Sequence, residues 1–200
     1  VTVWAKFEIA VEVQKHRSRT VERICRIGIE LLELNNQYGA VQIYLALISI
    51  DLSYFKNDLD VLFEVDELSH FMSTMGKLVD HSKNYAELRN MLWSLQSPAI
   101  PYLGVFLKDA FKADELLKIS KLQKVNPRQM EFLYSVYDKI ELFRNGDFSK
   151  TIRKNNNIIH FIHRQLHRAK KLNVRSLSLF CKKQSAKEKE KKPSKKSIFG

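Results

Sequence analysis

Three histidines, His160, His163 and His167, have the spacing in this sequence that is most similar to that of a metal site. They lie three and four residues apart, so a helix presents all three on one face, and imidazole nitrogens are common zinc ligands. Three positions along one straight helix rarely converge at the ~2.1 Å that a zinc ion requires, and no fourth ligand is obvious. We therefore favour a solvated basic face, shared with Arg164 and Arg168, and expect no metal site.

Sequence motifs of nucleotide hydrolysis, redox chemistry and disulfide bonding are missing. The chain lacks a glycine-rich phosphate loop that ends in Gly-Lys-Ser or Gly-Lys-Thr, a dinucleotide fingerprint and a paired-cysteine metal motif. Cys25 and Cys181 are separated by most of the sequence, which fits a reducing, intracellular setting better than a disulfide framework. We expect no nucleotide hydrolysis by this chain itself and no cofactor.

The formal net charge of +12 is unevenly distributed, because half of it comes from eight lysines and two glutamates between Lys182 and Ser197. Beyond Phe180 the Lys/Ser/Glu-rich composition cannot bury enough apolar area to offset the entropy of ordering. We therefore expect a domain at residues 1–180 and a disordered tail at residues 181–200. The tail could contact an anionic membrane, or serve as a solubilising or nuclear-localisation-like terminus. The lack of interleaved aromatic residues argues against sequence-specific nucleic-acid recognition.

Neither a signal peptide nor a membrane span is expected. The first segment carries Lys6, Glu8 and Glu12, and no later run is long enough and apolar enough to cross a bilayer. Because the chain begins at Val1 without a methionine, we expect it to be a piece of a longer polypeptide. We expect a cytoplasmic location, with recruitment to a membrane as an open alternative.

Apolar residues recur at helical spacing through most of the chain. The clearest example is the face shared by Thr20, Ile24, Ile27, Leu31 and Leu34, and no sustained strand-like alternation occurs. We therefore predict an all-α fold. The expected helices before residue 120 are Thr2–Val13, Ser18–Leu34, Tyr38–Ile50, Asp66–Val79, Ser82–Leu95 and Pro101–Ala113.

Two further helices are expected near the carboxyl end. Asn126 can cap the first of them, Pro127 suits its first position, and Asn145 with Gly146 marks its end. The second is expected from about Ser149 to Lys171, and the short connection predicts an antiparallel hairpin. In the first helix the pattern predicts that Met130, Leu133, Tyr137 and Ile140 are buried and that Ser135, Asp138, Lys139 and Glu141 are more exposed.

Four segments resemble a known family in order and spacing. Residues 82–109 end in SPAIPYLGVFLKD, which resembles the IPYLGVYLTDL stretch of the catalytic domain of Ras-type guanine-nucleotide exchange factors. The opening VTVWAKFEI resembles that family's V-x-x-W-V-x-x-E-I, and ELNN at residues 33–36 resembles its LNN element. KVNPRQMEFLYSVYDKIELF at residues 124–143 is similar to its helical hairpin, most closely in the Ras guanyl-releasing protein branch. The resemblance covers about Val3 to Leu172.

The resemblance implies a helical bundle with a projecting antiparallel helical hairpin. In that family the hairpin is a wedge that opens the nucleotide site of a Ras-type small GTPase, displacing the first switch segment, while core helices hold the second switch segment. The implied activity is guanine-nucleotide exchange on a Ras/Rap-class GTPase, without covalent chemistry and without a cofactor. Because binding is reciprocal, a factor that weakens nucleotide binding is itself weakened by nucleotide to the same degree.

Three groups of site residues follow from the resemblance. The core contact with the GTPase is assigned to Asn35 and Asn36. The scaffold of the second-switch pocket is assigned to Tyr102, Leu103, Gly104 and Val105, and the GTPase-binding face of the hairpin to Tyr134, Ser135, Asp138, Lys139 and Glu141.

The sequence also departs from the family pattern. Lys139 aligns where many members carry a glutamate, Gln37 where an aromatic residue usually follows the asparagine pair, and SYFKND at residues 53–58 where S-R-L-K-K-T-W is usual. The helices that usually precede the Trp4 segment are not in this sequence. These departures leave open an alternative, a catalytically inactive scaffold of the same shape that binds a GTPase or another protein. A basic-tailed nucleic-acid or membrane adaptor is the third interpretation.

Overall fold

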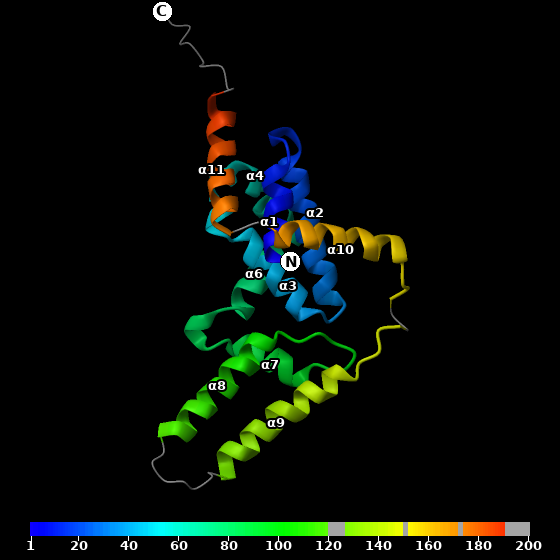
Figure 1. Cartoon of the computed structure of the whole chain (residues 1–200), viewed down its shortest axis with the longest axis vertical. Coiled ribbons are helices and arrows are strands. Elements are labelled where there is room, and N and C mark those ends of the chain that lie inside the picture. The colour runs from blue at the N-terminus through cyan, green and yellow to red at the C-terminus, as the bar shows by residue number, and fades with distance from the viewer. Residues whose placement is uncertain (120–126, 150–151, 172–173, 191–200) are drawn as a thin grey trace, which may run out of the picture. The chain divides into compact units, whose positions relative to one another are not determined.

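The computed structural model describes residues 1–119, 127–149, 152–171 and 174–190. These residues form α-helices and two short 3-10 helices and contain no β-strand, which confirms the predicted all-α class (Figure 1). The elements are α1 (Thr2–Val11), α2 (Gln14–Glu33), α3 (Gln37–Leu47), η1 (Ile50–Phe55), α4 (Lys56–Leu59), α5 (Val61–Glu64), α6 (Asp66–Leu78), η2 (His81–Lys83), α7 (Ala86–Ser94), α8 (Leu103–Ile119), α9 (Pro127–Arg144), α10 (Asn156–Lys170) and α11 (Val174–Glu190).

Most of the predicted helices are present, with shifted ends. The expected helix Ser82–Leu95 is divided into η2 and α7, because Asn84 and Tyr85 between them both adopt the left-handed conformation. The expected helix Pro101–Ala113 starts later and continues to Ile119 as α8. The short helices of residues 50–64 were not predicted, since none of them is long enough to show a helical period.

The chain divides into two compact units. Unit 1 comprises residues 1–28, 42–72 and 155–200. In this unit α10 and α11 both pack against α1, and α11 also packs against η1. Gly28 of α2 is needed for close packing, because a Cβ atom there would lie 2.7 Å from Cζ of Phe71 and 2.9 Å from Cγ2 of Ile43. The fully buried members of its core include Ile9, Val21, Leu52, Leu62 and Leu68.

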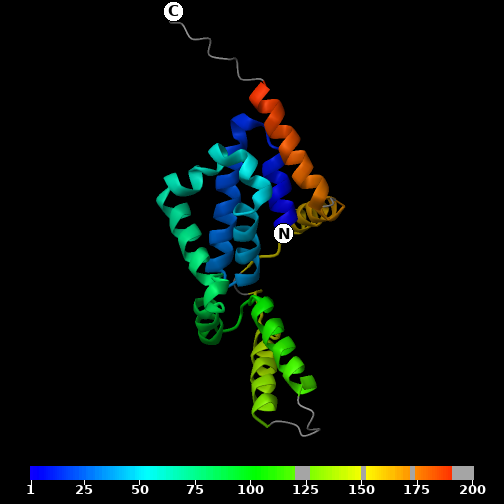
Figure 2. The same ribbon diagram turned by 90° about the vertical axis from the view of Figure 1, so that its left-hand side faces the viewer.

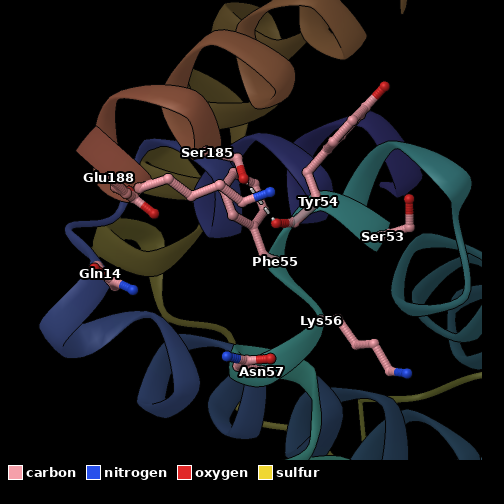
Figure 3. A pocket seen from close by; sticks show the side chains of 9 residues that line it. Gln14, Ser53, Tyr54, Phe55, Lys56, Asn57, Ser185 and Glu188 are labelled. Atoms are coloured by element: carbon pink, nitrogen blue, oxygen red, sulfur yellow. Dashed lines mark hydrogen bonds between the residues drawn. The ribbon is translucent and has the colours of Figure 1, made fainter. Parts of the chain in front are cut away.

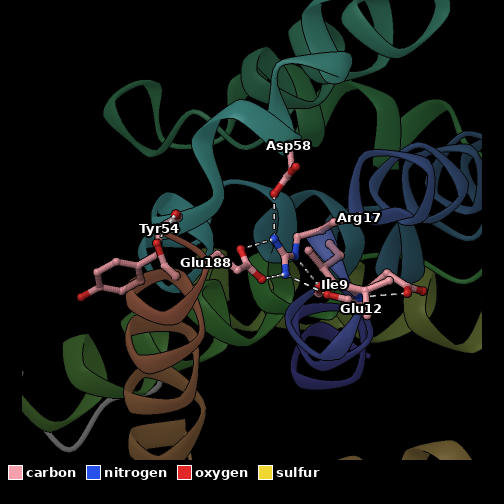
Figure 4. Close-up of polar contacts among 8 residues, drawn as sticks. Ile9, Glu12, Arg17, Tyr54, Asp58 and Glu188 are labelled. Atoms are coloured by element: carbon pink, nitrogen blue, oxygen red, sulfur yellow. Dashed lines mark hydrogen bonds and ion pairs between the residues drawn. The ribbon is translucent and has the colours of Figure 1, made fainter. Parts of the chain in front are cut away.

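Arg17 of α2 is completely buried in unit 1 and joins four segments of the chain (Figure 4). Its guanidinium donates to the backbone oxygens of Ile9 and Glu12, at 3.2 and 2.8 Å. It also donates to carboxylate oxygens of Asp58 and Glu188, at 2.8 and 2.6 Å. Burial lowers the pKa of Arg17, but the hydrogen bonds to Glu188 and Asp58 outweigh this effect and hold that pKa above its ordinary value. The network fixes α11 to the amino-terminal part of the chain.

The prediction of a disordered tail is wrong for residues 181–190, which belong to α11. Cys181 and Ser185 are buried, and the Ser185 hydroxyl donates to the backbone oxygen of Tyr54 at 3.0 Å. With Leu177 and Glu188, these side chains recur at helical spacing and form the packed face of α11. Averaged composition hides this face, because residues 182–190 are mostly lysine, glutamine and glutamate. The rest of the predicted tail, residues 191–200, lies outside the described residues.

Unit 2 comprises residues 29–41 and 73–154. In this unit α8 and α9 lie side by side and antiparallel (Figure 2). Val105 and Phe106 of α8 are buried, as are Val136 and Phe143 of α9. Side-chain hydrogen bonds connect this helix pair to α7, from Arg89 to Asp109 of α8 and from Lys139 of α9 to the backbone oxygen of Trp93.

The predicted pairing of the helical hairpin is wrong. The helix that starts at Pro127 packs against α8, which precedes it, whereas α10 packs against α1 in the other unit. Residue 149 does not begin a helix: Ser149 donates through its backbone N–H and its hydroxyl to Asp147, at 2.8 and 2.9 Å, which is a turn. The next helix begins only at Asn156, where Asn155 caps the first turn. The connection is therefore too long for a tight hairpin.

Candidate functional site

The segments that contain Asn35 and Tyr102 are neighbours in unit 2, although they are far apart in the sequence. The backbone N–H of Ile100 donates to the oxygen of Asn35 at 2.9 Å, and the N–H of Tyr38 donates to the oxygen of Ile100 at 3.2 Å. Asn35 adopts a left-handed conformation, φ 57°, which ends α2 and turns the chain toward residue 100. The two segments to which the resemblance assigned site residues are therefore adjacent in unit 2.

Asn36 has a structural role at this junction. Its side-chain oxygen accepts a hydrogen bond from the backbone N–H of Gly39 at 2.8 Å, as expected for the residue that caps α3. Asn36 is half-buried and Asn35 is exposed. Of the predicted asparagine pair, Asn35 is thus the more accessible, and Asn36 shapes the start of α3.

Tyr102 packs against Tyr38 at the start of α8. Their ring centroids are 6.2 Å apart with an interplanar angle of 29°, and burial raises the pKa of Tyr102 above its ordinary value. Gly104 allows the Tyr102 ring to lie against the helix, because a Cβ atom there would be 2.7 Å from the ring. Val105 anchors the helix in the core, whereas Leu103 is exposed. The predicted scaffold therefore contains both a buried residue that supports α8, Val105, and an exposed residue, Leu103.

An exposed apolar stripe runs along α8. Leu103, Leu107 and Phe111 are four residues apart and share one face, and the outermost, Phe111, is 70% exposed. Glu115 is exposed one further turn along the same face. Phe111 and Glu115 were not predicted from the sequence as site residues. The signal was present, because these positions repeat with helical period on the side opposite to the buried Val105 and Phe106.

The exposed face of α9 also differs from the prediction. Met130 and Tyr137 were expected to be buried, yet both are exposed, Tyr137 at 61%. The buried positions are instead Val136 and Phe143, with Leu133 and Ile140 half-buried. The outward stripe consists of Met130, Tyr134 and Tyr137, with Tyr134 69% exposed. The buried face of α9 was therefore predicted at the wrong angle around the helix, because α9 carries apolar residues on almost every side.

The other predicted hairpin residues lie in different environments. Asp138 is exposed and Ser135 is half-buried, with its hydroxyl donating to the backbone oxygen of Phe132 at 2.7 Å. Glu141 is half-buried and forms an ion pair with Arg144 at 2.9 Å. Asp138 and Glu141 also line a shallow depression of about 460 Å³ together with Lys139. This part of α9 is polar and accessible to solvent, and it lies next to the stripe of Met130, Tyr134 and Tyr137.

Lys139 braces α9 against the carboxyl end of α7. Its ammonium group donates to the backbone oxygens of Trp93 at 2.9 Å and Leu95 at 3.4 Å, and it lies 5.9 Å from the Trp93 ring and 5.5 Å from the Phe143 ring. The last carbonyl groups of a helix attract a cation. The lysine is half-buried, and its charge is directed toward α7. Contact with α7 is therefore a local structural reason for a lysine where the family pattern has a glutamate.

Arg89 of α7 fixes α8 in a similar way. Its guanidinium forms a two-pronged ion pair with Asp109, one branch at 2.7 Å, and a hydrogen bond to the backbone oxygen of Asn84 at 2.9 Å. The hydrogen bond to Asp109 raises the pKa of Arg89. Such bidentate pairs restrict geometry more than single contacts do. Together with Lys139, this pair holds α8 and α9 on α7 while their outer stripes remain open.

No group of three potential metal ligands is found among the described residues. His160, His163 and His167 are exposed on α10, and Nδ1 of His160 lies 2.7 Å from the backbone oxygen of Asn156. Cys25 and Cys181 are buried, and burial raises their pKa values to about 12 and about 11. Neither set has the geometry of a reactive centre.

A pocket of about 240 Å³ lies in unit 1 between α11 and η1 (Figure 3). It is lined by Tyr54, Phe55, Ser185 and Glu188, among others. Two of these residues hold α11 in place: Ser185 bonds to the backbone oxygen of Tyr54, and Glu188 pairs with Arg17. The lining therefore belongs to the packing of α11, and we assign no chemistry to it.

Within the described part of the chain, no single helix has the length and apolar character needed to cross a membrane. One bent pair of segments, Gln37–Leu47 and Ile50–Leu59, passes the same test together by length and composition only. Many of its apolar side chains are buried inside the protein, including Ile43, Leu47 and Leu52.

Comparison with known proteins agrees with these features. The chain matches the RasGEF domain over residues 1–165. It is 30% identical over 95 residues to Ras guanine nucleotide exchange factor C of Dictyostelium discoideum, which covers 48% of this chain and 6% of that protein. It is also 30% identical over 111 residues to the Ras-specific guanine nucleotide-releasing factor RalGPS1 of Danio rerio, which covers 54% of this chain and 19% of that protein. The chain belongs to the RasGEF domain family.

The family assignment is broader than the resemblance to a single branch. A third relative, Ras guanine nucleotide exchange factor W of Dictyostelium discoideum, is 22% identical over 146 residues, 66% of this chain and 12% of that protein. The chain thus spans about a fifth or less of the length of these relatives. Membership of the Ras guanyl-releasing protein branch stays a prediction.

Proposed function

We propose that this chain binds a Ras-type small GTPase of the Ras or Rap class and accelerates the release of its bound GDP. Family membership and the names of the relatives support this activity. The structural observation that supports it most is the open apolar surface of the α8–α9 pair, formed by Leu107 and Phe111 on one helix and Tyr134 and Tyr137 on the other. Exposed apolar patches of this kind are typical of protein interfaces.

The wedge in this proposal is the pair α8–α9, not the pair expected from sequence. Its base is continuous with Asn35 and Tyr38 through the hydrogen bonds to Ile100. We assign the second switch segment of the GTPase to this base and the nucleotide side to the outer part of the pair. Lys139, held by α7, is a positioning residue in this scheme, and it keeps α9 at a fixed angle to its support.

Exposed carboxylates on the pair contribute to nucleotide release. Glu115 continues the α8 stripe and Asp138 borders the α9 stripe. Two like charges ~4 Å apart repel by about 4 kcal/mol at an effective dielectric near 20, against about 1 kcal/mol in bulk water. A carboxylate brought beside a nucleotide phosphate therefore weakens nucleotide binding. The chain makes and breaks no covalent bond in this process and needs no cofactor.

The test is the release of fluorescent mant-GDP from purified Ras, Rap and Ral GTPases in the presence of the chain. We expect faster release from at least one GTPase, and loss of most of that acceleration for Phe111→Ala. Phe63→Ala is the matched control, because Phe63 is 67% exposed but lies in unit 1. Equal effects of the two substitutions would contradict the assignment of the surface.

The inactive-scaffold alternative is separated by the same experiment. A chain that binds nucleotide-free GTPase but leaves mant-GDP release at its spontaneous rate would be a scaffold. Replacing residues 134–141 by a scrambled polar segment should abolish binding in either case. A cytoplasmic location stays a prediction that fits a GTPase partner.

A further inference from the structure

The positive charge of this protein is concentrated after residue 147. Residues 148–187 contain eleven lysines and arginines and no aspartate or glutamate, whereas residues 1–147 contain eighteen basic and twenty acidic residues. This segment includes α10 and most of α11, which both pack against α1 in unit 1. α10 and α11 belong to unit 1, whereas α8 and α9 belong to unit 2. The eight basic residues from Arg164 to Lys187 therefore lie outside the helices of the proposed exchange surface.

The amino-terminal half of α10 carries an uncovered apolar stripe. Its carboxyl end is held in the fold, with Ala169 buried, while its amino-terminal end points away from α1 (Figure 1). Ile158, Phe161 and Ile162 are three and four residues apart and lie on one face of the helix. They are 55%, 51% and 45% exposed. In a water-exposed helix such a face is normally buried against a partner.

Basic side chains border this stripe. Arg164 and Arg168 follow Phe161 by three and seven residues, so they lie beside it on the helix surface, and both are exposed. The three histidines of α10 occupy the opposite face. An amphipathic helix with aromatic and aliphatic residues on one side and arginines or lysines next to them is the arrangement that lies in a lipid–water interface. Each basic residue near an anionic membrane adds a favourable contribution that decays within a Debye length.

We propose that α10 docks this protein on an anionic phospholipid bilayer. Ile158, Phe161 and Ile162 enter the region below the headgroups, and Arg164 and Arg168 contact lipid phosphates. The exposed lysines of α11, including Lys182, Lys183 and Lys187, add longer-range attraction to the same surface. A nucleic acid explains the charge but not the apolar stripe, because Phe161 is the single aromatic residue of α10 and offers no row of stacking platforms.

The test is sedimentation of the full chain with lipid vesicles, which does not depend on exchange activity. Vesicles of phosphatidylcholine with about 30% phosphatidylserine should bind the chain, and vesicles of phosphatidylcholine alone should bind it far less. Arg164→Glu combined with Arg168→Glu should weaken binding by roughly tenfold or more. The matched control is Arg19→Glu combined with Arg23→Glu, because these residues are exposed on α2 of the same unit with the same spacing. Both double variants change the net charge equally.

A second pair of variants tests the apolar stripe. Phe161→Ser should reduce vesicle binding, whereas Phe63→Ser, also at an exposed phenylalanine of unit 1, should not. Arg164→Lys with Arg168→Lys should retain binding, which keeps the test valid if the glutamate variants fail to fold.

Several results would overturn the proposal. These are equal losses for the α10 and α2 double variants, equal binding to neutral and anionic vesicles, and binding that disappears on removal of residues 191–200 but survives both α10 changes. Tighter binding to duplex DNA than to anionic vesicles at the same salt concentration would assign the surface to nucleic acid. A dimer in solution that Phe161→Ser dissociates would assign the stripe to a second copy of the chain.

Discussion

Replacing Arg17 by methionine removes the buried cation that joins α2, α4 and α11. The side chains of Asp58 and Glu188 are only 14% and 15% exposed, so they would be left as poorly solvated carboxylates without their partner. The guanidinium also lies 4.0 Å from the centre of the Phe55 ring and donates to two backbone oxygens. Removing one partner of a buried ion pair costs about 3–5 kcal/mol. For a chain of this size that corresponds to a melting temperature lower by roughly 6–20 °C.

Thermal unfolding followed by circular dichroism measures this loss. Arg26→Met is the matched control, because Arg26 also pairs with two carboxylates, Glu22 and Glu67, but its side chain is 46% exposed, and exposed pairs contribute little. Glu188→Gln keeps a hydrogen-bonding partner and should have an intermediate effect. Faster amide hydrogen exchange across α11 in Arg17→Met would show that this helix is released first. If Arg17→Met is no more destabilising than Arg26→Met, the network does not hold α11 and the reasoning is refuted.

Three further predictions concern buried polar groups. Burial raises the pKa of Asp51, but the ion pair with Lys6 at 2.7 Å outweighs burial and lowers that pKa below the ordinary 3.8. The contribution of Asp51 to stability should therefore be lost as pH falls below about 4. Asp51→Asn should flatten that part of a pH–stability curve. The raised pKa values of Cys25 and Cys181 predict that neither thiol reacts with iodoacetamide at pH 8 until the protein is unfolded, which mass spectrometry checks. The buried amide of Gln37 has no hydrogen-bond partner among the described residues, so Gln37→Met should raise the unfolding free energy by about 1–3 kcal/mol in urea titration.

Local signals predicted individual helices well. The apolar period of residues 20–34 matches α2, and Pro127 stands at the first position of α9 as its chemistry requires. The resemblance assigned Asn35 to a core contact and Tyr102 to the scaffold of the second-switch pocket, and hydrogen bonds to Ile100 make their segments neighbours. The roles of these residues in GTPase binding stay predictions. These features depend on neighbouring residues or on long matching strings, which a single sequence displays directly.

Pairing between helices was not predictable in the same way. Capping residues indicate where α9 begins and ends, but its partner depends on which apolar faces meet, and both α8 and α10 have such faces. The Asp147–Ser149 turn was interpreted as a helix start because serine is common in both. One of the two carboxylate partners of Arg17, Glu188, is 171 residues away, within a segment whose composition predicted disorder. Long-range ion pairs of this kind leave no local pattern.

The affinity of the chain for one GTPase in two states, nucleotide-free and GDP-bound, tests the central claim most directly. Linkage requires a protein that loosens GDP to bind the nucleotide-free state more tightly by the same factor. We predict a preference of at least about tenfold, or about 1.4 kcal/mol, measured by isothermal titration or biolayer interferometry. Equal affinities for the two states would contradict the account, because such binding cannot displace a nucleotide.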